Sequence, residues 1–368
     1  MKPIKLIINT KDQKYSILIG SNLLSKIGNI IKKNSINFKK CLLVIDKNVP
    51  RKFIIKIKKS FRNKKIYTQF IQANEKNKSQ KVINVILENL LNKNFTRNDC
   101  LIAIGGGITG DIGGFAASLC KRGVKFINIP TTLLAQVDSS IGGKTGINTK
   151  YGKNLIGSFY QPKLVISDIN FLKTLPKREI ICGYGEIFKH SLIADKTFFK
   201  FLNENISNIL DLKTPFIEKA IYKSCRIKKQ VVEKDEKEKN LRKILNFGHT
   251  FAHAYEASLN FSRRLNHGEA VILGMKSAFE FSHNKKFITY KEFDAAIKHL
   301  NNSRFPISIK NYFTTKKINQ IVSFMMRDKK NNSKNIKLMM IKKIGGPVIE
   351  KEFSNDTVKL FLKKKLIN

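Results

Sequence analysis

DCLIAIGGGITGD, residues 99–111, is the stretch from which the fold of this chain is predicted. The apolar run over 99–107 indicates a buried strand that ends in glycine, where a helix is expected to begin. Gly105, Gly107 and Gly110 satisfy the pattern G-x-G-x-x-G, which brings backbone N–H groups and a helix N-terminus up to a phosphate. A tight strand–helix turn without a ligand explains the same glycines equally well, so both interpretations stay open at this point.

Around this stretch, short apolar runs alternate with helical patterns, as is typical of β/α units around a parallel sheet. The N-terminal 20 residues predict a strand pair, and the next elements are predicted as strands over 41–46, 65–71 and 124–130 and a helix over 79–93. After about residue 175 long helical stretches predominate. We therefore predict an α/β domain over residues 1–175 and a mainly α-helical domain over residues 176–368.

The composition favours an ordinary globular protein of the cytoplasm. The hydrophobic fraction is 42%, and no apolar run reaches 18 residues, so no membrane span and no signal peptide are expected. The five cysteines are odd in number and form no C-x-x-C pair, which is typical of a reducing compartment and argues against a thiolate metal site.

The formal net charge of +43 invites a nucleic-acid-binding hypothesis. The lysines, however, are spread over the whole length together with many Asn and Ile residues, the pattern that an A/T-rich coding bias produces. No RNA-binding, zinc-finger or helix-turn-helix signature accompanies them. We therefore expect no specific nucleic-acid partner, and only the cations inside motifs are considered for function.

Two stretches rich in Gly, Ser and Thr, residues 130–148 and 151–162, are predicted to be loops. Each carries a lysine between glycines, Lys144 and Lys153. A lysine in such a loop suits an anionic small molecule, although a solvated loop explains a single lysine as well. Asp46, at the end of an earlier predicted strand, is a candidate for holding a ribose hydroxyl.

Three of the six histidines lie within residues 246–269. His249 and His253 are four residues apart and lie on one face of a predicted helix, while His267 opens another helix after a polar loop. Imidazole is the commonest neutral metal ligand and carries protons near pH 7. The three rings therefore predict a site for metal binding or proton transfer, against the alternative of ordinary packed histidines.

Two further spacings bear on this histidine cluster. Glu186 and Lys189 are predicted on one helix, three residues apart, where an ion pair between them is one interpretation and a carboxylate ligand for the histidine site is the other. Arg242, Asn246 and His249 follow at intervals of four and three, which predicts one shared helix face. Spacing alone does not single out Lys228 among its neighbouring cations.

Taken together and in this order, the motifs resemble the 3-dehydroquinate synthase family. The resemblance extends over nearly all of the chain and rests on GGGITGDIGGFAAS, RGVKFINIPTTLLAQVDSSIGGKTGIN, GKNLIGSFYQP, LKTLPKRE, GEIFKH, LNFGHTFAHAYE, HGEAV and MRDKK. It implies an N-terminal α/β NAD-binding domain followed by a mainly α-helical domain that binds metal and substrate. Gly185 and Phe188 depart from the family pattern, in which alanine and a smaller aliphatic residue are usual.

The resemblance also implies roles for individual residues. The divalent metal, zinc or cobalt, is expected at Glu186, His249 and His267, with His253 assisting proton transfer. NAD-contacting positions are Asp46, Asn48, Glu75, Lys78, Gly106, Gly107, Asp111, Thr131, Thr132, Lys144, Lys153, Phe171 and Thr174. Substrate-contacting positions are Asp138, Lys144, Lys153, Asn154, Lys189, Lys228, Arg242, Asn246 and Lys329, and Arg122 is expected to reach the substrate phosphate of the partner subunit in a homodimer. Lys144, Lys189, Lys228, Arg242 and Asn246 are also expected to take part in catalysis.

The implied reaction converts 3-deoxy-D-arabino-heptulosonate 7-phosphate to 3-dehydroquinate and phosphate, a step of the shikimate pathway to the aromatic amino acids. It passes through transient oxidation by NAD, β-elimination of phosphate, reduction and an intramolecular aldol closure. A related sugar-phosphate cyclase or a metal-dependent polyol dehydrogenase is the alternative enzyme. A basic nucleic-acid-binding protein is the alternative outside enzymes.

Overall fold

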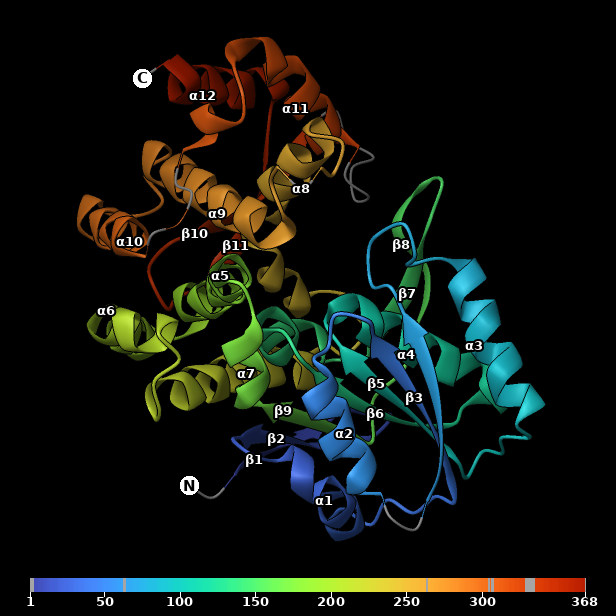
Figure 1. Ribbon diagram of the computed structural model, residues 1–368. Coiled ribbons are helices and arrows are strands. Elements are labelled where there is room, and N and C mark those ends of the chain that lie inside the picture. The colour runs from blue at the N-terminus through green and yellow to red at the C-terminus, as the bar shows by residue number, and fades with distance from the viewer. Residues whose placement is uncertain are drawn as a thin grey trace. The chain divides into compact units, whose positions relative to one another are not determined.

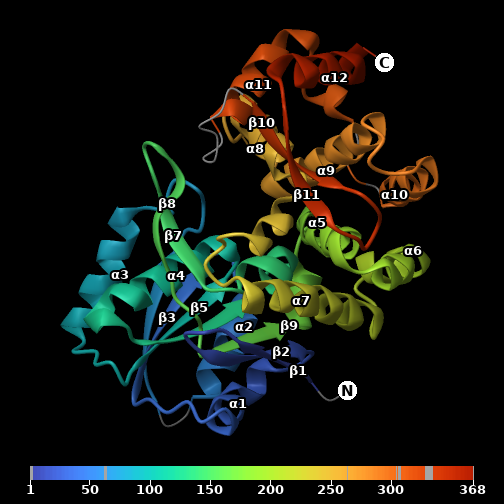
Figure 2. The ribbon, with the colours of Figure 1, turned by 180° about the vertical axis from the view of Figure 1, so that it is seen from behind.

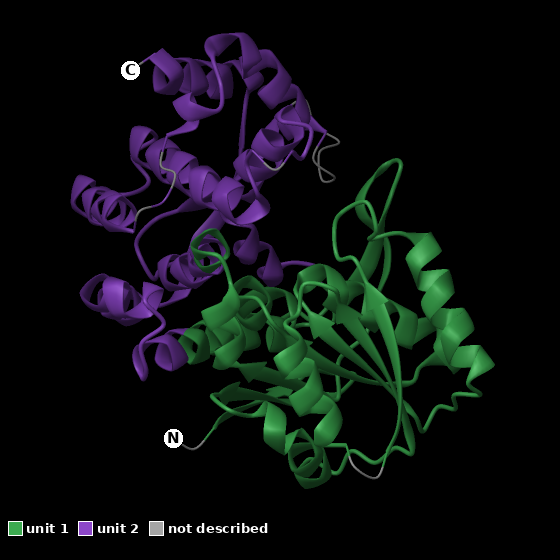
Figure 3. Cartoon of the chain, viewed as in Figure 1, with its two compact units in different colours: residues 1–180, 221–237 green, residues 181–220, 238–368 purple. Residues whose placement is uncertain are grey.

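The computed structural model describes residues 3–61, 64–262, 264–303, 305, 308–327 and 335–367. The chain divides into two compact units, residues 1–180 with 221–237 and residues 181–220 with 238–368, coloured separately in Figure 3. An N-terminal α/β part and a helical C-terminal part are as predicted. The predicted boundary between an NAD-binding domain, residues 1–175, and a metal- and substrate-binding domain, residues 176–368, stays a prediction.

In the described part of the first unit, seven strands form one sheet in the order β1-β2-β9-β6-β5-β3-β4 (Figure 1). Only β1 and β2 pair antiparallel, and the other neighbours are parallel. The bounds of the strands of the sheet are β1 Ile4–Asn9, β2 Lys14–Gly20, β3 Lys40–Asp46, β4 Lys65–Ile71, β5 Cys100–Gly105, β6 Lys125–Pro130 and β9 Leu164–Asp168. The predicted strands and the N-terminal strand pair are confirmed.

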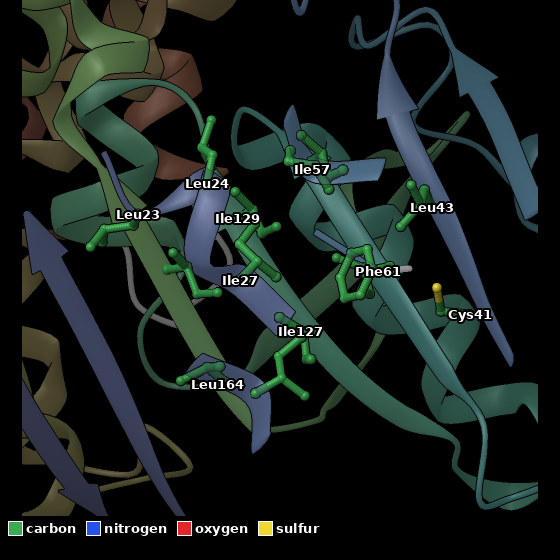
Figure 4. Packing of buried hydrophobic residues seen from close by; sticks show 14 of the residues in the cluster. Leu23, Leu24, Ile27, Cys41, Leu43, Ile57, Phe61, Ile127, Ile129 and Leu164 are labelled. Carbon is green, nitrogen blue, oxygen red and sulfur yellow. The ribbon is translucent and has the colours of Figure 1, made fainter. Parts of the chain in front are cut away.

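Helices cover both faces of this sheet, which explains why its central strands are apolar throughout. In β3, Cys41, Leu43 and Ile45 contribute to one core cluster while Leu42 and Val44 contribute to the other. Figure 4 shows side chains of the first cluster, to which Leu23, Leu24, Ile27, Ile57, Phe61, Ile127, Ile129 and Leu164 belong. The helices of the unit are α1 Ile27–Lys33, α2 Arg51–Lys59, α3 Gln80–Asn92 and α4 Gly107–Leu119.

A hairpin replaces the two predicted glycine-rich loops. β7 Lys144–Thr149 pairs antiparallel with β8 Gly152–Phe159. The loop prediction was wrong here because glycine in a strand also permits close approach of backbones: a Cβ on Gly157 would lie 2.0 Å from the carbonyl oxygen of Thr145. Lys144 and Lys153 therefore stand on strands.

Helices predominate in the second unit (Figure 2). Two helices are shared by both units, α5 Lys177–Ala194 and α7 Phe216–Lys234. The remaining elements are α6 Lys196–Leu210, α8 His249–Ser258, α9 His267–Asn284, α10 Tyr290–Asn302, α11 Ile318–Met326, α12 Asn355–Ile367 and a hairpin of β10 Ile336–Ile341 and β11 Val348–Phe353. None of the helices in the described residues has the length and apolar character needed to cross a membrane.

Candidate active site

The glycine turn of the first unit joins β5 directly to the first turn of α4. A Cβ on Gly105 would lie 2.4 Å from Thr109 Oγ1, and one on Gly107 would lie 2.9 Å from Ser139 Oγ. Packing alone therefore requires glycine at position 105 and disfavours a side chain at position 107. The same absence of side chains leaves the N-terminus of α4 bare, so the turn is also suited to a phosphate group.

Neighbouring parallel strands bring the other predicted nucleotide residues to this edge of the sheet. Ile45 pairs with Ile104, and Gly105 pairs with Pro130, so Asp46, Gly106 and Thr131 lie at the ends of three adjacent strands. Thr132 comes next in the chain. Burial raises the pKa of Asp46, although its Oδ1 accepts a hydrogen bond from the Asn48 amide at 3.1 Å.

An ionic network joins five of the predicted ligand-binding residues. Lys78 Nζ lies 2.5 Å from Asp111 Oδ2 and 2.5 Å from Asn154 Oδ1, and Lys153 Nζ lies 3.1 Å from Glu75 Oε1. Burial raises the pKa of Asp111 in spite of Lys78. Burial also raises the pKa of Glu75, but Lys153, Asn148 and Lys78 together have a larger effect. The pKa of Glu75 is therefore lowered. Each of the two lysines in this network is therefore held by a carboxylate.

Three other predicted contacts have distinct environments. Lys144 is exposed and follows Gly142 and Gly143, whose φ angles of 93° and 66° are left-handed. Phe171 lies in the core, with its ring centroid 4.5 Å from that of Phe53, so only its backbone is placed to contact a ligand. Thr174 is exposed and donates its hydroxyl to the Phe171 carbonyl at 2.8 Å.

Lys228 is singled out by the structure although its spacing did not select it. It is 5% exposed, and its Nζ lies 2.5 Å from Asp138 Oδ1 and 2.7 Å from the Asp138 carbonyl oxygen. Asp138 lies in a π-helical segment, Ala135–Ser139, a form that occurs frequently at functional sites. Two residues predicted to contact substrate are thus in direct contact.

Arg122 lies on the turn that follows α4. Lys121 and Arg122 have left-handed φ angles of 53° and 62°, which non-glycine residues adopt at a cost. The Arg97 Nε donates to the Lys121 carbonyl at 2.7 Å. Together with Asn94, Phe95 and Thr96, these three cationic residues line a surface hollow.

The second unit brings the three histidines together. The ring centroid of His249 lies 5.4 Å from that of His253 and 6.0 Å from that of His267. The centroids of His253 and His267 are 6.2 Å apart. His267 Nδ1 is 2.9 Å from Glu256 Oε2, and His249 Nδ1 is 3.3 Å from the Phe247 carbonyl. Both acceptors require an Nδ1–H, so the neutral form of each ring has its lone pair on Nε2, the atom that would bind a metal ion.

Local sequence explains how His249 and His267 are presented. Asn266 and Glu269 form a reciprocal capping box that starts α9 at His267. Burial, followed by the positive charge of Lys189, lowers the pKa of His249 well below its ordinary value. The His249 imidazole therefore stays neutral, which is the form that binds metals.

Glu186 and Lys189 form the intrahelical ion pair that was one of the two interpretations. Lys189 Nζ lies 2.5 Å from Glu186 Oε2, and both side chains are almost fully buried. The alternative interpretation, a carboxylate ligand for the histidine site, stays a prediction. Lys189 also acts electrostatically on His249. The carboxylate and the imidazole cluster therefore share a cationic neighbour.

The predicted shared helix face of Arg242, Asn246 and His249 is wrong. Leu241–Asn246 is a separate 3-10 helix, and α8 begins only at His249. The chain turns at Gly248, which has a φ of 80° and where a Cβ would lie 2.6 Å from the Met275 nitrogen. Arg242 is buried, and Asn246 donates to Glu238 Oε1 at 3.0 Å. Lys329 lies outside the described residues.

Sequence reasoning missed two kinds of supporting residue. Glu256, the partner of His267, lies seven residues after His249 on α8 and therefore on the same face, a signal that was available in the sequence. Tyr15 and Gln161 had no such signal: Tyr15 accepts from the Gly142 amide at 3.2 Å, and Gln161 lies where a Cβ on Gly143 would have to fit.

Comparisons with known proteins agree with this arrangement. Models of the N-terminal and C-terminal parts of 3-dehydroquinate synthase match residues 68–182 and 183–331. A 3-dehydroquinate synthase of Pelagibacter ubique is 60% identical over 363 residues, which cover 99% of each chain. Two solved structures share the fold: a 2-deoxy-scyllo-inosose synthase complexed with carbaglucose-6-phosphate, NAD+ and Co2+ (TM-score 0.88, 23% identity, 99% of this chain and 100% of that one), and the 2-epi-5-epi-valiolone synthase of Streptomyces hygroscopicus with NAD+ and Zn2+ (TM-score 0.85, 22% identity, 97% and 98%).

Proposed function

The chain belongs to the 3-dehydroquinate synthase family, and from this premise we propose how its residues carry out that family's reaction. The enzyme converts 3-deoxy-D-arabino-heptulosonate 7-phosphate to 3-dehydroquinate and phosphate. We propose that it does so in the shikimate pathway and in the cytoplasm, where a reducing environment suits its five buried free cysteines.

Glu186, His249 and His267 are proposed as the ligands of a divalent metal ion, zinc or cobalt. One carboxylate and two imidazoles are the donor set of open catalytic zinc sites. The observation that carries this proposal is the group of three imidazole rings, in which His249 and His267 each direct Nδ1 to an oxygen. The solved relatives with Co2+ and Zn2+ support the choice of metal.

NAD is proposed to bind along the strand ends of the first unit. The bare N-terminus of α4 suits its phosphates, and Asp46 suits a ribose hydroxyl. The further residues proposed for this site are Asn48, Glu75, Lys78, Gly106, Gly107, Asp111, Thr131, Thr132, Lys144, Lys153, Thr174 and the backbone of Phe171. When bound, NAD accepts and returns a hydride, and the metal ion acts as a Lewis acid toward substrate hydroxyls.

The chain's own cations are proposed to hold the carboxylate and phosphate of the substrate. Lys228 is fixed by Asp138, and Lys153 is fixed by Glu75, so each ammonium group is already positioned before an anion arrives. Lys144, Asn154, Lys189, Arg242, Asn246 and Lys329 complete the proposed substrate contacts. His253, exposed beside the two ligand histidines, is proposed to carry protons between substrate and solvent.

A homodimer is proposed because Arg122 stands on a strained turn of the surface and is expected to reach the phosphate in the partner's site. Mixing two inactive variants tests this. Arg122→Ala and Lys228→Ala proteins, each inactive, are refolded together so that mixed dimers form. If Arg122 acts across subunits, one site of each mixed dimer keeps both residues and activity returns. If it acts within its own subunit, the mixture stays inactive.

Release of phosphate from the heptulosonate with a trace of NAD tests the function as a whole. Phosphate is expected to exceed the amount of NAD many times over, because the hydride returns within each turnover. Stoichiometric accumulation of NADH without phosphate would instead identify a polyol dehydrogenase. Absence of both products would overturn the proposed function.

A further inference from the structure

The helix that carries Glu186 is held on two sides. Successive residues of an α-helix are rotated by about 100°, so Tyr184 and Phe188 lie on nearly one face and Glu186 lies about 200° away from each. Cys182 and Gly185 occupy the side between them. α5 therefore has a face for packing and a different face for chemistry.

On one side, α5 packs closely against α9 through one glycine on each helix. A Cβ on Gly185 would lie 2.8 Å from Ile272 Cγ1, and a Cβ on Gly268 would lie 2.3 Å from Cys182 Cβ. Gly185 precedes Glu186 and Gly268 follows His267, so this contact joins the two helices next to a proposed metal ligand on each. A small rotation of α5 would move the Glu186 carboxylate relative to the His267 ring.

On the other side, the imidazole of His299 in α10 covers Tyr184 and Phe188. The His299 ring is stacked on the Phe188 ring at 4.4 Å with an interplanar angle of 8°. Its Nε2 lies 3.0 Å from the Tyr184 hydroxyl oxygen, and its Nδ1 bonds to Asn203 Oδ1 of α6. His299 is 3% exposed, and burial lowers its pKa to about 3, so the ring is neutral.

These contacts fix the ring completely. An amide oxygen only accepts, so His299 Nδ1 donates to Asn203, and Nε2 is left to accept from the Tyr184 hydroxyl. The stacking and the hydrogen bond act on two residues of α5 one turn apart, which opposes both rotation and sliding of the helix. Packed interiors transmit such constraints because they contain little free volume.

We propose that His299 is a positioning residue, which holds α5 against α9 and thereby sets Glu186 relative to His267. This inference rests on the proposed ligand set. It assigns no direct contact with metal or substrate to His299. The residue acts through the backbone of α5.

Binding of Co2+ to the 368-residue protein tests the inference. Two quantities are measured: the dissociation constant, by competition with a chelator, and the visible absorption spectrum of the bound ion. His299→Leu removes both hydrogen bonds and the stacking, and is expected to weaken Co2+ binding about tenfold or more and to change the spectrum. His299→Gln, which keeps a polar group for Tyr184, is expected to recover part of the affinity. Tyr184→Phe removes only the hydrogen bond and serves if His299→Leu does not fold.

The control is Val358→Ala, which opens a cavity at a fully buried position of α12 away from α5. It is expected to lower stability without changing the Co2+ affinity or spectrum. Unchanged Co2+ binding in His299→Leu, or in Tyr184→Phe if that variant has to replace it, would overturn the inference. Failure of the wild-type protein to bind Co2+, or wild-type affinity in Glu186→Gln, would instead overturn the proposed ligand set.

Discussion

The buried imidazole of His299 predicts a specific loss of stability in acid. Its pKa is lowered from 6.5 to about 3 by burial, whereas the unfolded chain titrates near 6.5. Between these two values the unfolded state binds a proton that the folded state does not, so the free energy of unfolding falls as the pH falls. The stability is fully present above pH 6.5. It decreases by about 1.4 kcal/mol for each pH unit below that value.

The size of the effect follows from the width of this window. At pH 5 the loss amounts to about 2 kcal/mol, and at pH 3 to about 5 kcal/mol. His299→Gln keeps a polar side chain but has no group that titrates, so it is expected to start from a lower stability and to lose about 2 kcal/mol less than the wild type between pH 7 and pH 5. A protein of this size is typically stable by only about 5–15 kcal/mol, so the difference is measurable.

Urea unfolding followed by circular dichroism at pH 7 and pH 5 measures this difference. EDTA is present in all samples, so that loss of a bound metal ion contributes nothing. Tyr184→Phe is the matched control: it removes the hydrogen bond but keeps the buried imidazole, and is expected to show the wild-type dependence on pH. A parallel decline of wild type and His299→Gln would refute the argument that this ring is held neutral.

Three further outcomes are expected. Lys144→Ala and Arg242→Ala are each expected to lower kcat/KM by about 10- to 100-fold, the cost of losing a hydrogen bond from a charged group, with both proteins still folded. Wild-type kinetics in both would contradict the anion-binding role. Chelation is expected to abolish phosphate release and zinc or cobalt to restore it, whereas a fully active metal-free enzyme would contradict the ligand set. Gly185→Ala is expected to destabilise the protein by about 1–3 kcal/mol in urea unfolding, because overpacking against Ile272 Cγ1 at 2.8 Å and Cδ1 at 3.1 Å outweighs a gain of about 1 kcal/mol in helix propensity. An added Ile272→Val substitution, which removes only Cδ1, is expected to recover part of the loss.

The strands of the large sheet, the helix α3 and the start of α9 were predictable because they depend on local patterns. The apolar runs of β3 and β5 are buried on both faces, and such runs stand out in any sequence. His267 opens α9 because Asn266 and Glu269 are three residues apart, which is also a local signal. Gly185 shows the limit of local reasoning: helix propensity marks it as a weakness, whereas the packing against Ile272 requires it.

Features that depend on distant residues were not predictable in this way. The hairpin of β7 and β8 looked like two loops because its glycines serve the contact between the strands. Gly248 looked like an ordinary helix residue, but the position of Met275, 27 residues later, forces a turn there. The carboxylate partner of Lys228 lies 90 residues earlier in the chain, so no spacing near Lys228 could have selected it.

Carboxylate partners offset the charge of several of the proposed functional cations. In a chain with a formal net charge of +43, most lysines are interchangeable sources of positive potential that any polyanion can use. Lys78, Lys153, Lys189 and Lys228 are each paired with a carboxylate at 2.5–3.1 Å, as is Lys298 outside the proposed site, 2.8 Å from Asp294. A paired ammonium group contributes little to the long-range field, so it does not attract nucleic acid.

The same pairing lowers the cost of binding a small anion. A solvent-exposed lysine loses up to about 2 kcal/mol of side-chain entropy when a ligand fixes it, whereas Lys228, held between the carboxylate and the carbonyl of Asp138, has already lost that freedom on folding. Selectivity for one sugar phosphate therefore depends on the acids that hold the cations in place and not on the number of cations. Asp138→Asn is expected on this argument to raise the KM for substrate although it makes the protein more positive, and a lower KM would show that bulk charge governs binding.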